Sequence, residues 1–105
     1  MAVIHHIKEL SQLPDIITFQ EVIPETQSLL IRHLGGSYAE KSYLDGLWRQ
    51  YFTMVFIKHE MKYLSGERLE FPCGSGMGRD ILSSSVEVCG RVVTCYRLYI
   101  SFRKL

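Results

Sequence analysis

The sequence predicts an α/β fold of the α+β kind, with helices on one face of a mixed sheet. Two observations lead to this class. The first third of the 105-residue chain reads as helix, strand, helix, and the remainder reads as strands. The composition, with 47% hydrophobic and 22% charged residues, is that of an ordinary globular domain. A chain of this length forms one domain or a piece of one.

The first part of the chain is predicted to hold three elements. Apolar residues at helical spacing predict a short amphipathic helix over 2–12, which Pro14 ends. The β-branched and aromatic run 16–20 predicts a buried strand. Pro24 suits the first position of a second helix, and the glycine pair 35–36 predicts its end.

The second part is predicted to consist of strands. Residues 51–58 are apolar on both alternating faces, which predicts a strand buried on both sides. We expect 61–64 to pair back on this strand, and 72–78, with its three glycines, to form a loop. The runs 81–88 and 92–102 flank a short glycine-containing connection that is typical of a hairpin.

Charge and cysteine content exclude several classes of protein. Twelve Lys and Arg against eleven Asp and Glu give a net charge of +1, which is too balanced for a general nucleic-acid-binding surface. Three cysteines, at positions 73, 89 and 95, fit neither a disulfide scaffold nor a structural zinc site, so we interpret them as free thiols in a reducing compartment. The sequence shows no signal peptide and no apolar run long enough to span a bilayer, so no membrane partner is predicted.

Three residues are candidates for a functional site. Glu21 follows the 16–20 strand at its carboxyl end, where ligands bind in open α/β sheets, and a carboxylate there suits Mg²⁺. A solvated loop residue is the alternative interpretation of Glu21. The glycine-rich loop lacks the spacing of a nucleotide loop, but it can present Arg79 to an anion or an aromatic ring. A solvated arginine is the alternative there, and Tyr51 either lines a cleft or belongs to the core.

Four segments carry a resemblance to a known family. The run 13–22, LPDIITFQEV, resembles the strand ending in Gln-Glu of the endonuclease/exonuclease/phosphatase superfamily. The runs 20–25 (QEVIPE), 51–53 (YFT) and 71–82 (FP, then MGRDIL) resemble the tyrosyl-DNA phosphodiesterase 2 family within that superfamily. The order and spacing of these segments match the family from about residue 12 to about residue 92, and 93–105 is a divergent tail.

The resemblance implies a fold, an activity and a set of site residues. It implies that the chain is an incomplete part of a four-layer αββα sandwich. The implied activity is Mg²⁺-dependent hydrolysis of the bond between a tyrosine and the 5′-phosphate of DNA, which frees DNA ends blocked by trapped topoisomerase II during DNA repair. Glu21 would hold Mg²⁺, or Mn²⁺ in its place, Tyr51 would face the 5′ end of the DNA, and Arg79 would lie near the tyrosyl leaving group. The family is located in the nucleus and cytoplasm.

Several motifs of the family are missing from this sequence. They are the Asn-bearing first strand, the TSHLES segment, the GD-x-N pair and the closing SDH. We therefore expect a truncated or alternatively terminated domain with no complete catalytic set, weak Mg²⁺ binding and no hydrolysis by this chain alone. Two alternatives stay open: a non-catalytic interaction or structural domain of the same descent, and a small α+β binding domain with an accidental likeness.

Uncovered apolar surface is the physical consequence of an incomplete sandwich. One predicted strand has Phe52, Met54 and Phe56 on one face. The last strand has four large apolar residues on one face: Tyr96, Leu98, Ile100 and Phe102. Such faces would be buried between the sheets of a complete domain. We therefore expect self-association through an uncovered sheet face.

Overall fold

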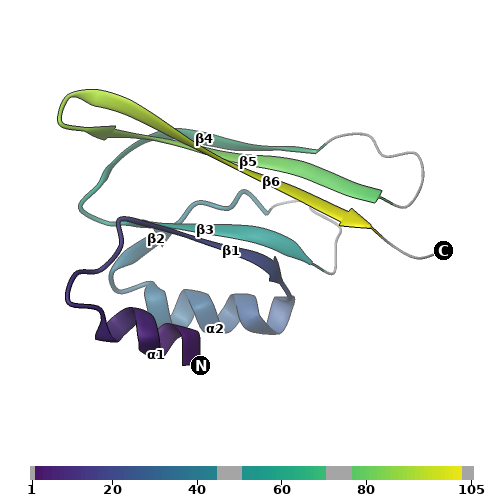
Figure 1. Ribbon diagram of the computed structural model, residues 1–105, viewed down its shortest axis with the longest axis horizontal. Coiled ribbons are helices and arrows are strands. Elements are labelled where there is room, and N and C mark those ends of the chain that lie inside the picture. The colour runs from purple at the N-terminus through teal and green to yellow at the C-terminus, as the bar shows by residue number, and fades with distance from the viewer. Residues whose placement is uncertain (1, 45–50, 71–76, 103–105) are drawn as a thin grey trace.

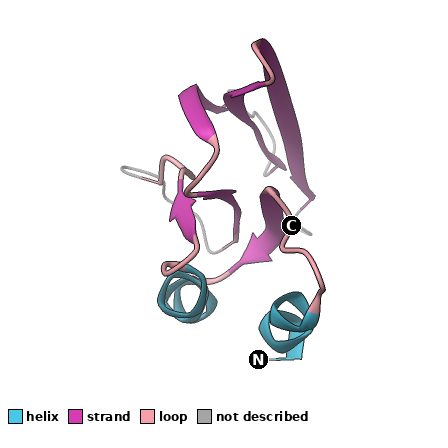
Figure 2. Ribbon diagram, turned by 90° about the vertical axis from the view of Figure 1, so that its left-hand side faces the viewer, coloured by secondary structure: helices cyan, strands magenta, loops and turns pink. Residues whose placement is uncertain are grey.

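The described residues form two helices and two three-stranded antiparallel sheets arranged in layers. The computed structural model describes residues 2–44, 51–70 and 77–102. Figure 2 shows the layers end-on, with both helices packed against one face of the first sheet and the second sheet on its other face. Within these described residues no helix is long and apolar enough to cross a membrane.

The helices form where the apolar spacing predicts them. Helix α1 (Ala2–Glu9) buries Ile4 and Ile7, and it ends three residues before the predicted end. The amide of Leu10 closes its last turn on the carbonyl of Ile7 at 3.2 Å, after which the chain leaves the helix and Leu13 packs on the core.

The second helix follows the prediction closely. Helix α2 (Pro24–Leu34) begins at its proline and buries Leu30 and Leu34. Gly35 caps its end by donating to the carbonyl of Ile31 at 2.9 Å. Both predicted boundaries are therefore confirmed.

The first sheet is built around one central strand. It contains β1 (Ile16–Val22), β2 (Tyr38–Glu40) and β3 (Phe52–Lys58) in the order β1-β3-β2. Every residue of β3 from Phe52 to Ile57 is buried, as predicted. The predicted uncovered face on this strand is wrong, because the helices cover Phe52, Met54 and Phe56.

The second sheet is a meander of β4 (Lys62–Glu70), β5 (Met77–Val88) and β6 (Arg91–Phe102). The predicted hairpin between β5 and β6 is confirmed. Its two turn residues, Cys89 and Gly90, have φ of 50° and 76°, which is the signature of a type I′ turn. Residues 77 and 78, predicted as loop, belong to β5, and 72–76 lie outside the described residues.

The predicted pairing of 61–64 and the predicted single mixed sheet are both wrong. The segment 61–64 does not pair with β3, because β1 and β2 already occupy both edges of that strand. Instead, a tight turn, in which the Met61 amide donates to the Lys58 carbonyl at 2.9 Å, leads the chain into the second sheet. The single mixed sheet is therefore replaced by two separate antiparallel sheets, while the predicted placement of helices on one face is confirmed.

The two faces of β3 hold two hydrophobic clusters. The helix-side cluster contains Met54 and Phe56, and Phe19 meets Phe56 edge-on at 5.8 Å between ring centroids. The cluster between the sheets is smaller and joins Val55 and Ile57 to residues of β5. Strand β3 thus belongs to both cores.

Candidate functional site

Glu21 lies in a β-bulge at the end of β1. The pairing steps from Phe19 opposite Met54 to Val22 opposite Phe52, so two residues of β1 face one residue of β3. Glu21 is exposed and has φ of 54°, a left-handed conformation that costs a non-glycine residue about 1–2 kcal/mol. Bulges and strained residues concentrate beside functional sites. The Glu21 carboxylate therefore faces solvent, and the bulge keeps its backbone in an unfavourable conformation.

Tyr51 lies at the same end of the first sheet as Glu21. It precedes Phe52 directly, and Phe52 pairs with Val22, the residue after Glu21. The Tyr51 side chain is 44% exposed. Tyr51 is therefore not a core residue, and the register of β1 on β3 places it beside the bulge.

Arg79 is the third residue of β5, where it pairs with Ile100, and its side chain lies outside the described part of the structure. Figure 1 shows that β1 ends, and that β3 and β5 begin, at the same end of the two stacked sheets. The topology thus brings the backbones of all three predicted site residues to one end of the molecule.

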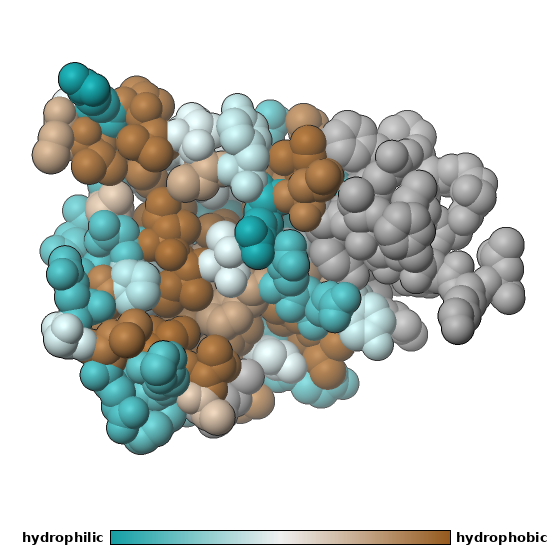
Figure 3. Space-filling view, in the orientation of Figure 1, coloured by the Kyte–Doolittle hydropathy of each residue, from teal (hydrophilic) through white to brown (hydrophobic). Residues whose placement is uncertain are grey.

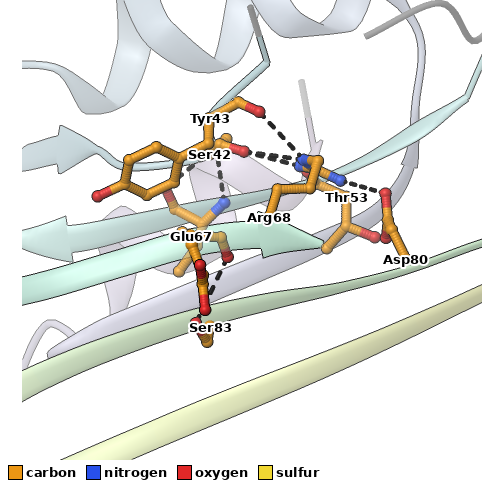
Figure 4. Close-up of polar contacts among 8 residues, drawn as sticks. Ser42, Tyr43, Thr53, Glu67, Arg68, Asp80 and Ser83 are labelled. Carbon is orange, nitrogen blue, oxygen red and sulfur yellow. Dashed lines mark hydrogen bonds and ion pairs between the residues drawn. The ribbon is translucent and has the colours of Figure 1, made fainter. Parts of the chain in front are cut away.

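A buried ion pair between β4 and β5 of the second sheet lies at this end, and its arginine also reaches the first sheet. The Arg68 Nη1 lies 2.7 Å from Oδ2 of Asp80, and these side chains are 4% and 0% exposed. Arg68 also donates from Nη2 to the backbone carbonyl of Thr53 at the start of β3 (Figure 4). Since charge-assisted hydrogen bonds are the strong ones, this guanidinium holds the starts of β5 and β3 together.

The same guanidinium fixes the segment that follows β2. Arg68 donates from Nε to the Ser42 carbonyl at 3.0 Å and to the Tyr43 carbonyl at 3.3 Å, and from Nη2 to the Ser42 carbonyl at 2.9 Å. The Ser42 hydroxyl in turn accepts from the amide of Val55 at 2.9 Å. Arg68 therefore connects four parts of the chain that are distant in sequence.

Sequence analysis missed this polar cluster. The burial of Asp80 could have been predicted, because it lies an even number of residues from the buried Leu82 and Val86 and therefore on the same face of β5. The burial of Arg68 could not have been predicted, because a bulge between Tyr63 and Ser65 reverses the inward and outward positions along β4. Simple alternation from the start of β4 would have placed Arg68 on the outer face.

Glu21 is the acidic group that the sequence predicts as the metal ligand of this site. Over the described ranges, no three His, Cys, Asp or Glu side chains come together as a metal site. A single exposed carboxylate such as Glu21 fits a Mg²⁺ ion that keeps most of its water ligands. It does not fit a closed site that holds metal tightly.

No protein-family model matches this chain, and a search of curated proteins finds no match. Solved structures do match it. The structure of selenomethionine TDP2 from Caenorhabditis elegans aligns with a TM-score of 0.72 at 24% sequence identity over 99% of this chain. This chain has the fold of one part of TDP2.

Two further structures agree. TDP2 from C. elegans aligns with a TM-score of 0.70 at 23% identity over 93% of this chain. Truncated C. elegans TDP2 aligns with a TM-score of 0.71 at 24% identity over 99% of this chain. The chain spans 29%, 28% and 39% of the three TDP2 chains, in the order given. At this identity the likeness is one of fold. The α+β class and the partial sandwich expected from the sequence are therefore confirmed.

Proposed function

We propose that this chain forms one part of a Mg²⁺-dependent 5′-tyrosyl-DNA phosphodiesterase site of the TDP2 kind. Glu21 is the protein ligand of the metal in this proposal, and Tyr51 and Arg79 flank the 5′ end of the DNA. The natural substrate class would be DNA ends joined to the tyrosine of trapped topoisomerase II. The observation that supports it most is the strained, solvent-facing Glu21 beside the exposed Tyr51 at one sheet end.

Each residue supplies a separate physical contribution. The Glu21 carboxylate offers hard oxygen ligands, and a bound Mg²⁺ would act as a Lewis acid toward a phosphoryl oxygen. The Tyr51 ring offers a flat apolar surface on which a base or a leaving tyrosine can stack. The Arg79 guanidinium carries a permanent charge that suits phosphate oxygens and aromatic faces alike.

Catalysis by this chain alone is not part of the proposal. Phosphodiester hydrolysis needs groups that orient water and stabilise the charge of the transition state, and removing one such group costs about 10²–10³ in rate. Within the described residues no cluster of three metal-ligating side chains surrounds Glu21, whereas the reaction needs several cooperating groups. We expect the purified 105-residue chain to bind a 5′-phosphotyrosyl oligonucleotide weakly and not to turn it over.

Metal binding provides the first test. Titration calorimetry with Mg²⁺ should show no saturable heat, whereas added Mn²⁺ should broaden the NMR amide signals of Glu21 and its neighbours through paramagnetic relaxation. Glu21→Gln should remove that broadening. The matched control is Glu25→Gln, an exposed carboxylate in the first turn of α2. Broadening that survives in Glu21→Gln would refute the assignment of Glu21.

Substrate binding provides the second test. Arg79→Gln and Tyr51→Ala should each weaken binding of a 5′-phosphotyrosyl oligonucleotide several-fold, since one stacked base contributes about 1–3 kcal/mol. The matched control is Arg91→Gln, which removes the same charge at the hairpin end of the same pair of strands. An equal effect of the control would mean that binding is general charge attraction, and Mg²⁺-dependent turnover would show a more complete site than proposed.

A non-catalytic interaction domain of the same descent is the second candidate function. The exposed apolar residues of β6 favour it, because large exposed apolar patches mark interaction surfaces. Binding of the oligonucleotide that does not respond to Glu21, Tyr51 or Arg79 would support this function over the first.

A further inference from the structure

Strand β6 lies at one edge of the second sheet and runs along its whole length (Figure 1). It pairs with β5 from residue 91 to residue 102 without a register shift. Since the sheet order is β4-β5-β6, no strand among the described residues covers the other side of β6. This leaves a long straight edge of backbone donors and acceptors.

The other three sheet edges carry features that discourage pairing with another chain. Strand β1 contains the bulge at Glu21, and β2 is only three residues long. Strand β4 contains a bulge and exposes the charged residues Lys62 and Glu67. Bulges, short strands and charges are the usual means of protecting an edge. Strand β6 contains no bulge and no proline, and its charged residues are two exposed arginines, Arg91 and Arg97.

The outer face of β6 is also apolar and exposed. Val92, Tyr96 and Leu98 are 64%, 72% and 50% exposed. In Figure 3, hydrophobic residues gather at the hairpin end of β5 and β6. An edge that is long, flat and apolar is a predicted association site.

We propose that β6 pairs in antiparallel register with β6 of a second copy of this chain, about a two-fold axis at Cys95. The two second sheets then join into one continuous six-stranded sheet. A self-complementary strand pair of this type is the usual geometry of a symmetric dimer. This inference is independent of the proposed phosphodiesterase function.

Charge disfavours two of the registers near the middle of β6. Antiparallel self-pairing centred on residue 94 places Arg91 opposite Arg97, and centring on Arg97 places that residue opposite itself, so both bring like charges together. Centring on Cys95 places Arg97 opposite Val93. The register centred on Cys95 therefore avoids the like-charge repulsion that the registers centred on residue 94 and on Arg97 would create.

The register centred on Cys95 also matches the outer face. It places Val92 opposite Leu98 and Thr94 opposite Tyr96, which are an aliphatic pair and a pair of a β-branched with an aromatic residue. Pairs of these kinds stabilise antiparallel strands. The same register places Cys95 opposite the partner's Cys95. Directly opposed residues have Cα atoms about 4.5–5.5 Å apart, which lies within the range that a disulfide spans.

Disulfide trapping tests the register directly. With Cys73 and Cys89 replaced by serine, the full chain treated with oxidised glutathione should form a dimer linked through Cys95. The control keeps only Cys89, with Cys73→Ser and Cys95→Ser. Cys89 is more exposed than Cys95, so random collisions would link the control faster. Faster linkage through Cys95 supports the proposal, and faster linkage through Cys89 overturns it.

Sedimentation of the reduced chain tests the edge without a covalent bond. The chain should sediment as a dimer, and Val92→Lys with Tyr96→Lys should raise the dimer dissociation constant by about tenfold or more, because each lysine enters the interface twice. Leu64→Lys, an exposed apolar position on β4, should leave the dimer unchanged. A monomer, which would leave the edge to a strand of another protein, overturns the proposal. A dimer that resists the β6 lysines overturns it as well.

Discussion

The buried pair of Arg68 and Asp80 allows a quantitative prediction about stability. Removing one partner of such a pair leaves an uncompensated charge in the interior and typically costs about 3–5 kcal/mol. Both side chains are almost fully buried here, so solvent cannot replace the lost partner. We expect Arg68→Met and Asp80→Leu each to lower the free energy of unfolding by an amount in this range. That is a large part of the about 5–15 kcal/mol that holds a domain folded.

The two single variants should not lose the same amount of stability. Arg68→Met removes the donor to the carbonyls of Ser42, Tyr43 and Thr53 as well as the partner of Asp80. Asp80→Leu leaves the four hydrogen bonds to these carbonyls in place. Since each lost hydrogen bond contributes about 0.5–1.5 kcal/mol, Arg68→Met should be the more destabilising change.

The double variant separates charge burial from packing. Replacing a buried pair by apolar residues of similar volume is often neutral, so Arg68→Met with Asp80→Leu should regain much of the loss. The carbonyls that Arg68 bonded stay without that donor, so a deficit of about 1–3 kcal/mol should remain. The double variant should therefore be more stable than either single variant.

Urea unfolding followed by circular dichroism measures these free energies. The matched control is Lys62→Met with Glu87→Leu, an exposed pair at 3.4 Å between the same two strands, which should change stability by about 0–1 kcal/mol. The reasoning is refuted if the single variants at Arg68 and Asp80 lose no more than this control. It is also refuted if the loss in the double variant equals the sum of the single losses.

Substitutions at four further positions have definite expected outcomes in the same unfolding assay. Glu21→Gly should stabilise the chain by about 1 kcal/mol, because glycine adopts the left-handed conformation without strain, whereas Glu21→Ala should not. Gly66→Ala should destabilise strongly, since the added Cβ would lie 2.6 Å from the Ser83 carbonyl oxygen, which is backbone and cannot move aside; unchanged stability would contradict this. Gly90→Ala should cost about 1 kcal/mol through its φ of 76° alone, because the space around it is open. Tyr38→Phe should cost about 1 kcal/mol at neutral pH by removing the hydrogen bond to the Pro14 carbonyl at 2.6 Å. Burial raises the pKa of the Tyr38 hydroxyl above its ordinary 10.0. The stabilisation from this hydroxyl is therefore present below pH 10.0 and lost as the pH rises through the raised pKa. The difference in unfolding free energy between the original chain and Tyr38→Phe should become smaller over that pH range.

Helix boundaries and buried strands were predictable because their signals are local. Pro24 and Gly35 bound α2 through backbone properties that act at their own positions. The apolar run of β3 predicts burial on both faces, which requires no knowledge of what covers them. The turn at Cys89 and Gly90 was likewise recognisable from its composition and length.

The exposure of β6 was partly predictable. Alternation places Tyr96, Leu98, Ile100 and Phe102 on one face. Tyr96 and Leu98 are exposed as expected, but they lie on the outer face of the second sheet and not between the two sheets. The side chains of Ile100 and Phe102 lie outside the described part of the structure. The same reasoning failed for Phe52, Met54 and Phe56, because alternation shows which residues share a face and not which element covers that face. Two helices cover it, and their own sequences do not say against which strand they pack.

The candidate site combines both kinds of information. The resemblance and the strand end predicted Glu21, Tyr51 and Arg79 from the sequence, and their roles remain predictions. The left-handed conformation of Glu21 could not be predicted, because the bulge arises from the register of β1 on β3. Arg68 was hidden for the same reason, since the bulge in β4 turns it inward.

The sequence by itself thus determined most of the elements, though not β2, together with their order and the faces on which most side chains lie. Tertiary structure alone decided the division into two sheets, the position of the bulges and the meeting of Arg68 with Asp80. The physical reason is that side-chain periodicity is a local property of a strand, whereas strand pairing uses backbone hydrogen bonds that are the same for nearly every residue. Which strands pair, and in which register, therefore depends on the packing of the whole chain.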